Sequence, residues 1–131
     1  MTQSDSPSKG IFWAGWILTG LVAAFLLLDS ALHFSVPPPV VDAFSRLGIP
    51  LAVSHTIAIL LLASVVLYLI PNTSVLGAIL ITGYLGGAIA IHLRAGSTPF
   101  EIVFPAIFAA LAWTGIWLRE PRLRALLPLR D

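Results

Sequence analysis

The sequence contains no cysteine, and this absence excludes several kinds of chemistry. A chain without cysteine forms no disulfide, has no thiolate nucleophile, and holds neither a cysteine-bound iron–sulfur cluster nor a thiolate zinc site. Any redox reaction in which this protein takes part must therefore depend on a bound cofactor or on the substrate itself.

Charge is scarce as well. Only 10% of the 131 residues are charged and 58% are hydrophobic, whereas an ordinary soluble domain has about 25% charged residues. Seven Lys and Arg oppose six Asp and Glu, so no basic field exists to attract nucleic acid. The polar side chains are too few to cover a soluble protein of this length, and we expect a lipid bilayer to surround the chain.

Long uncharged stretches predict four membrane-spanning helices. These stretches cover residues 11–28, 48–93 and 102–118, and a turn sequence at 71–74 interrupts the middle one. A span needs about 20 apolar residues to cross a hydrocarbon core of about 30 Å, so the middle stretch supplies two spans. We expect an all-α, antiparallel four-helix bundle with helices at about 11–34, 50–70, 74–95 and 99–118. Residues 11–118 then form one domain, between a flexible polar N-terminus (1–10) and a basic cytoplasmic tail (119–131).

The distribution of basic residues predicts the orientation. An even number of spans places both termini on one side of the membrane, and cytoplasmic segments are enriched in Lys and Arg. Basic residues precede the first helix and follow the last, at Lys9, Arg119, Arg122, Arg124 and Arg130. Trp and Tyr residues, which favour membrane interfaces, cluster at the same end of the helices. We therefore expect cytoplasmic termini in a multi-pass protein of a cell membrane, specifically a bacterial inner membrane.

Six ionisable residues are expected at the opposite, outer end of the bundle. They are Asp29, His33, His55, His92, Arg94 and Glu101. Antiparallel threading brings the end of the first and third helices and the start of the second and fourth to one level. Ionisable groups are costly in lipid and generally face a bundle interior or water, so their gathering at one level favours a functional site.

Helical spacing indicates which of these side chains can meet. Asp29 and His33 are four residues apart, so they share a helical face and can pair. Tyr84 lies eight residues before His92 and is expected to form a deeper floor to the same cavity. The G-x-x-x-G spacing from Gly83 to Gly87 predicts that a neighbouring helix approaches closely.

These patterns lead to a set of assignments. Catalytic roles are assigned to Asp29, His33, His92 and Glu101, and substrate-binding roles to His55, Tyr84 and Arg94. Glu101 has a structural alternative, because it completes a capping box with Thr98, and Arg94 can instead extend to lipid headgroups. No residue is assigned as a metal ligand.

The connector between the first two helices is expected to form a short amphipathic turn on the outer surface. Its apolar residues, Val40, Val41, Phe44 and Leu47, are expected to face the bundle. In that position the connector serves either as a plain link or as a lid.

Several motifs resemble the DoxX-like family of small four-helix membrane proteins. They are the acid and histidine that end the first helix (Asp29 to His33), the short outer connector, and the passage His92-x-x-x-Gly96-x-x-Pro99 within residues 83–105. The resemblance implies the fold and the membrane location, and it points to His92 and the turn at Gly96 and Pro99. The family is named after a membrane subunit linked to thiosulfate:quinone oxidoreduction, and related proteins are associated with membrane redox complexes.

Three functions are compatible with these observations. In the first, the polar residues perform acid–base chemistry on a small lipophilic, quinone-like molecule, in an isomerisation, a hydrolysis or a quinone redox reaction. In the second, His and carboxylate side chains hold a metal, which ranks lower because no Glu-x-x-His spacing is present. In the third, the chain is a non-catalytic accessory subunit of a membrane redox complex or forms a homo-oligomer.

The orientation can be tested with reporter fusions. A reporter joined after Arg46 is expected on the outer side, and one joined after Asn72 on the cytoplasmic side, because positive charge holds the termini inside. Alkaline phosphatase and green fluorescent protein report the two sides with opposite signals. The reverse pattern would contradict the predicted orientation.

Overall fold

The fold is all-α. The computed structural model describes residues 8–129, so most of the segment expected to be a flexible N-terminus, and Arg130, lie outside the described residues. The elements are α1 (Lys9–Ser35), α2 (Pro38–Leu47), η1 (Leu51–Val53), α3 (Ser54–Leu69), η2 (Pro71–Thr73), α4 (Ser74–Ala95), α5 (Pro99–Arg119) and α6 (Pro121–Arg124). Four of these segments are long and apolar enough to cross a membrane. The prediction of four membrane-spanning helices is confirmed, and their limits agree with the predicted ones to within a few residues.

Local sequence fixes where the helices end. The Ser8 hydroxyl accepts a hydrogen bond from the Ile11 amide at the start of α1. Gly96, with a φ of 68°, ends α4 in the left-handed conformation that glycine adopts without strain. Thr98 and Glu101 form the predicted capping box at the start of α5. Pro105 lies inside α5 and offers no amide to the carbonyl of Glu101.

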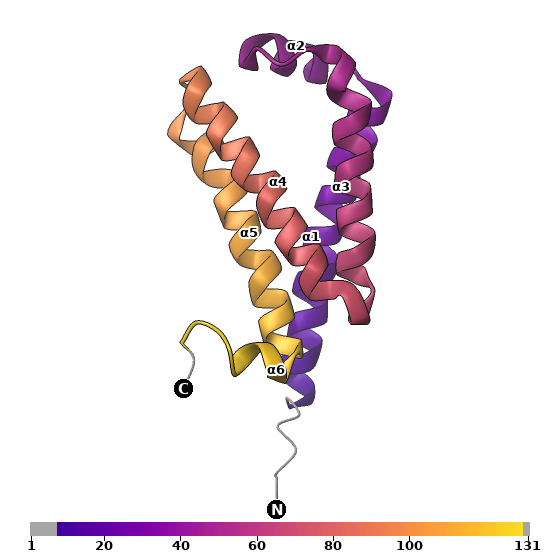
Figure 1. Ribbon diagram of the computed structural model, residues 1–131, viewed down its shortest axis with the longest axis vertical. Coiled ribbons are helices and arrows are strands. Elements are labelled where there is room, and N and C mark those ends of the chain that lie inside the picture. The colour runs from indigo at the N-terminus through magenta and orange to yellow at the C-terminus, as the bar shows by residue number, and fades with distance from the viewer. Residues whose placement is uncertain (1–7, 130–131) are drawn as a thin grey trace, which may run out of the picture.

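The four long helices form a closed ring in which each packs against two others. Helix α1 contacts α3 and α5, and α4 contacts the same two helices. The helices converge at the α6 end, whereas toward the other end the pair α4 and α5 spreads away from the pair α1 and α3 (Figure 1). Helix α2 lies across this wide end (Figure 1). The bundle is therefore tapered rather than parallel-sided.

Glycines allow the tight packing at the narrow end. A Cβ atom added to Gly15 of α1 would lie 2.7 Å from the carbonyl oxygen of Gly115 in α5, and one added to Gly77 of α4 would collide with the backbone of Tyr68 in α3. The buried apolar residues lie mainly in this half of the bundle and include Val22, Leu61, Val65, Ile81 and Ile116. In lipid, helices associate through such close packing because no hydrophobic effect drives them together.

The prediction of close helix packing at Gly83 and Gly87 is wrong. A Cβ added to either glycine would have no atom within 4 Å, and both residues are exposed. Gly77, six residues before Gly83, makes the close contact with α3 instead. The spacing pattern did not identify the contact because it carries no information about which face of α4 meets a neighbour.

Arg119 lies inside the bundle, although the sequence placed it in a cytoplasmic tail. It is the last residue of α5, and only 8% of it is exposed. Its Nε donates to the Thr19 hydroxyl at 3.2 Å, and its guanidinium carbon lies 4.1 Å from the centre of the Trp16 ring. Tyr68, expected at the membrane interface, is fully buried and donates its hydroxyl proton to the Ala112 carbonyl at 2.8 Å. Polar groups therefore help to close the narrow end.

The close contact at Gly77 leads to a stability prediction. Gly77→Ala should lower the thermal unfolding temperature in detergent, because the new Cβ collides with the backbone of α3, and overpacking of this kind costs about 1–3 kcal/mol. Gly86→Ala is the matched control, since a Cβ at that position meets nothing within 4 Å. Equal stability of the two variants would contradict the proposed packing.

Candidate functional site

A cavity of about 550 Å³ lies at the wide end of the bundle. Residues of α1, α2, α4 and α5 line it, together with Ile57 of α3, and most of these residues are apolar. Its polar lining residues are Asp29, His33, Arg46, Tyr84 and His92. The taper of the bundle creates the cavity, because the helices that touch at the narrow end have separated at this level.

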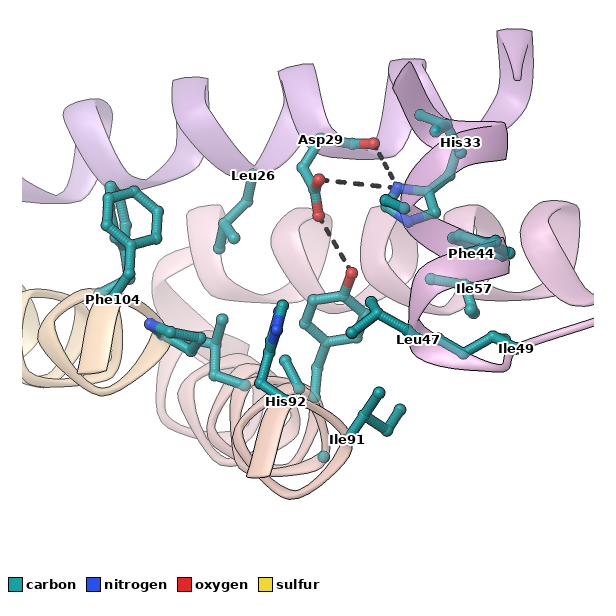
Figure 2. A pocket seen from close by; sticks show the side chains of 18 of the residues that line it. Leu26, Asp29, His33, Phe44, Leu47, Ile49, Ile57, Ile91, His92 and Phe104 are labelled. Atoms are coloured by element: carbon teal, nitrogen blue, oxygen red, sulfur yellow. Dashed lines mark hydrogen bonds and ion pairs between the residues drawn. The ribbon is translucent and has the colours of Figure 1, made fainter. Parts of the chain in front are cut away.

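Asp29 is the centre of the polar groups. Its Oδ2 accepts a hydrogen bond of 3.0 Å from the Tyr84 hydroxyl, and its Oδ1 lies 3.6 Å from Nδ1 of His33 (Figure 2). The same Nδ1 donates to the main-chain carbonyl of Asp29 at 2.7 Å. A carbonyl oxygen can only accept, so Nδ1 carries the proton, and in neutral His33 the basic lone pair is on Nε2.

Two serine hydroxyls fix α1 against α3 at the level of Asp29. Ser30 donates to the carbonyl of Ala58 at 2.9 Å, and Ser54 donates to the carbonyl of His33 at 2.7 Å. Both serines are buried. These contacts set the rotation of α1, so that Asp29 and His33 face the cavity. These contacts cannot be predicted from the sequence, because a serine in an apolar helix gives no sign of which carbonyl it meets.

His92 enters the cavity from α4. Figure 2 shows its ring projecting from α4 toward α1, which carries Asp29 and His33. Nδ1 of His92 lies 2.9 Å from the Ser97 hydroxyl, and the Ser97 amide donates to the His92 carbonyl at 3.0 Å. The turn at Gly96 thus folds back to orient the ring. A second histidine on another helix faces the pair on α1.

Helix α2 covers the mouth of the cavity at the wide end of the bundle. Phe44 is buried and its ring lies 5.6 Å from that of His33, while Val40 and Leu47 also line the cavity. The connector is a helix of ten residues, and three of its four apolar residues face the bundle as predicted. Val41 is exposed instead, at 39%.

Two polar contacts fasten α2 to the opposite pair of helices. Arg46 forms an ion pair with Glu101 of α5, with 2.7 Å between Nη1 and Oε1. Arg94 of α4 donates from Nη2 to the carbonyl of Leu47 at 2.8 Å. The ion pair is largely exposed to solvent, so it stabilises the closed arrangement only weakly.

Three of the residues assigned to the site lie outside the cavity lining. Glu101 is held in the capping box and in the ion pair with Arg46, and Arg94 is bound to α2. His55 is exposed, and its Nε2 donates to the carbonyl of Phe34 at 3.0 Å. The structure therefore brings Asp29, His33, Tyr84 and His92 together in the cavity lining. Glu101 and Arg94 instead bind α2, the helix that covers the cavity. Arg46 is the polar lining residue that was not predicted from the sequence.

The cavity does not have the geometry of a metal centre. Among residues 8–129, no group of three or more His, Asp or Glu side chains lies close enough to hold a metal ion. Asp29 and His33 supply only two candidate ligands, and their oxygen and nitrogen atoms already interact with each other and with Tyr84. The arrangement is better suited to proton transfer and to hydrogen bonding of a ligand.

Comparison with known proteins identifies a family whose model matches most of the chain. The model of a family described as DoxX-like matches residues 17–115, which include the cavity and all seven residues assigned to the site. No curated protein and no solved structure matches the chain.

The fastening of α2 can be tested by hydrogen exchange. Arg46→Ala should raise the amide exchange of residues 40–47 by about two- to fivefold, because an exposed ion pair contributes modestly to a local closed state. Asp42→Asn is the control on the same helix, since Asp42 forms no ion pair within the described residues. Unchanged amide exchange in Arg46→Ala would show that the ion pair with Glu101 does not hold α2 against the bundle.

Proposed function

The chain belongs to the DoxX-like family of membrane proteins, and from this premise we propose that its cavity binds a small lipophilic, quinone-like molecule and exchanges protons with it. The observation that carries the proposal is the position of Asp29. This carboxyl interacts with both Tyr84 and His33 inside a mostly apolar cavity that opens among membrane helices.

The apolar lining supports a lipophilic ligand. Ligand cavities of about 300–1,000 Å³ are typically apolar with a few convergent polar groups, and this cavity of about 550 Å³ has that composition. The polar groups stand on two facing helices, α1 and α4, so a flat molecule with oxygen atoms on opposite edges can be bound from both sides. A quinone, whose two carbonyl oxygen atoms lie on opposite edges of a flat ring, is such a molecule.

The roles of the polar side chains follow from their contacts. His33 is the general base or acid, because its Nδ1 is fixed by Asp29 and its Nε2 is left to exchange a proton. Asp29 orients the imidazole through its main-chain carbonyl and its carboxylate. His92 donates to or accepts from a ligand oxygen through its Nε2, while Ser97 orients the ring. Tyr84 holds the Asp29 carboxyl in place from below.

One observation favours the alternative of a non-catalytic accessory subunit. Asp29 is already satisfied by Tyr84 and His33, as a purely structural polar cluster between α1 and α4 would be. In that case the cluster would stabilise the bundle, and the associated redox chemistry would belong to a partner. If the cavity binds a ligand, changes to the polar residues will affect ligand retention. If the cluster is purely structural, they will affect stability alone.

Variants of the polar cluster distinguish these functions. In Asp29→Asn, His33→Ala and His92→Ala, the affinity for decylubiquinone should fall by about tenfold or more, because each change removes part of one coupled site. The double variant Asp29→Asn/His33→Ala should lose little more than either single variant. Affinity is measured by equilibrium binding to the protein in nanodiscs, and co-purified lipophilic molecules are quantified by mass spectrometry.

His55→Ala is the matched control, because it removes a histidine at the same end of the bundle but outside the cavity lining. Its ligand binding should equal that of the unaltered protein. Full retention of the ligand in all the cavity variants, with only additive losses of thermal stability, would contradict the proposed function and support the accessory role.

A further inference from the structure

We infer that the cavity has a lateral opening between α3 and α4, through which a single-tailed amphiphile enters from the leaflet at the α2 end. The inference deepens the proposed function and rests on it for the nature of the ligand. It specifies a molecule with a polar ring or head and one alkyl or isoprenoid tail, rather than a compact molecule delivered from water.

The first observation is that α3 and α4 separate within a few turns. At Gly77 the two helices touch, since a Cβ there would collide with the backbone of Tyr68. Beyond Gly77, α4 runs away from α3 toward the wide end of the bundle (Figure 1). The seam between α3 and α4 is therefore closed near the narrow end and widens toward the level of the cavity.

The second observation is the direction in which these glycines face. With about 100° per residue, Gly83 and Gly87 lie roughly 80–120° around α4 from Gly77, on the side away from Thr82. Gly77 faces α3, and Thr82 faces α5 because it accepts a hydrogen bond from Trp113 at 2.6 Å. Gly83 and Gly87 therefore lie on the far edge of the seam with α3, where α4 faces lipid.

The third observation is that both glycines belong to two surfaces at once. Gly83 and Gly87 line the cavity and are exposed, and by the helical geometry above they lie on the side of α4 that faces lipid. A residue that borders the cavity and the exterior marks an opening. Ile57 and Ile91 also line the cavity and are apolar, as an opening to acyl chains requires.

The opposite seam, between α1 and α5, is closed by aromatic rings. Phe25 of α1 stacks on Phe108 of α5 with 4.2 Å between ring centres, and Phe104 lies 5.5 Å from Phe25 and 4.9 Å from Phe108. Phe104 is seen at the cavity edge in Figure 2. The mouth at the wide end is covered by α2. The seam bordered by Gly83 and Gly87 has no side chain at either glycine, so we assign it as the way into the cavity.

The depth of the opening indicates the chemistry of the ligand. With a rise of about 1.5 Å per residue, Gly83 and Gly87 lie roughly 14–20 Å along α4 from its start at Ser74, within a run of residues without charge. The opening therefore faces hydrocarbon. His92 and His33 lie closer to the α2 end of the bundle, so a ligand with its head at the histidines would pass its tail outward between α3 and α4.

The absence of cysteine makes the opening testable without any ligand. Ala88→Cys places a single thiol on the cavity wall. In liposomes this thiol should react with N-dodecylmaleimide, a single-tailed reagent dissolved in the bilayer. Adding Gly87→Leu or Gly83→Leu should slow the reaction by about tenfold, because a side chain then crosses the opening and access limits the rate.

Gly86→Leu is the matched control. Gly86 is equally free of neighbours within 4 Å but does not line the cavity, so it should leave the labelling rate within about twofold of the Ala88→Cys protein. Similar slowing by Gly86→Leu and Gly87→Leu, or no slowing by Gly87→Leu, would overturn the lateral opening. None of the three Leu substitutions, at Gly83, Gly86 or Gly87, is expected to impair folding, because a Cβ at each position meets nothing within 4 Å. Thermal unfolding in detergent checks this.

A binding measurement on the cysteine-free protein tests the class of ligand. Gly87→Leu should weaken decylubiquinone by about tenfold and the same quinone ring without its tail by less than about twofold, because only the tail occupies the opening. Equal effects on both quinones would overturn the single-tailed ligand. If Asp29→Asn retains full binding while the labelling result holds, the proposed chemistry fails and the lateral opening stands.

Discussion

Contact between helix backbones at one end of the bundle is the constraint on which the rest of the structure depends. In a bilayer, lipid is as apolar as leucine, so helices associate where small residues let their backbones meet. Gly15 meets Gly115, and Gly77 meets Tyr68, all in the half of the bundle nearer α6. Helices joined closely at one end and not at the other diverge, and the divergence provides space for a cavity without any loss of the buried core.

The polar residues complete this arrangement at the wide end. A diverging bundle exposes polar groups to lipid unless they find partners, and unpaired polar groups in hydrocarbon are costly. Ser30 and Ser54 bind carbonyl groups across α1 and α3, and Asp29 joins α1 to α4 through Tyr84. Asp29 and Tyr84 thus both stabilise the open half of the fold and line the cavity. Ser30 is the immediate neighbour of Asp29, and Ser54 binds the carbonyl of His33.

The sequence predicted the helices and the level of the polar residues, because apolar run length and antiparallel threading depend only on the order of residues. It also predicted the pairing of Asp29 with His33, which follows from a spacing of four. It did not predict the surroundings of Glu101 and Arg94, since both depend on the position of α2, a separate helix whose contacts with α4 and α5 are long-range. The role of Gly83 and Gly87 was reversed for a similar reason, as the same spacing suits a close helix contact and an unobstructed opening.

The closed narrow end has a consequence for the direction of proton movement. Between the cavity and the buried Arg119 lie the apolar side chains of Val22, Leu61, Val65 and Ile81, which carry no exchangeable proton. Protons taken up or released by His33 would therefore exchange with the water at the α2 end alone.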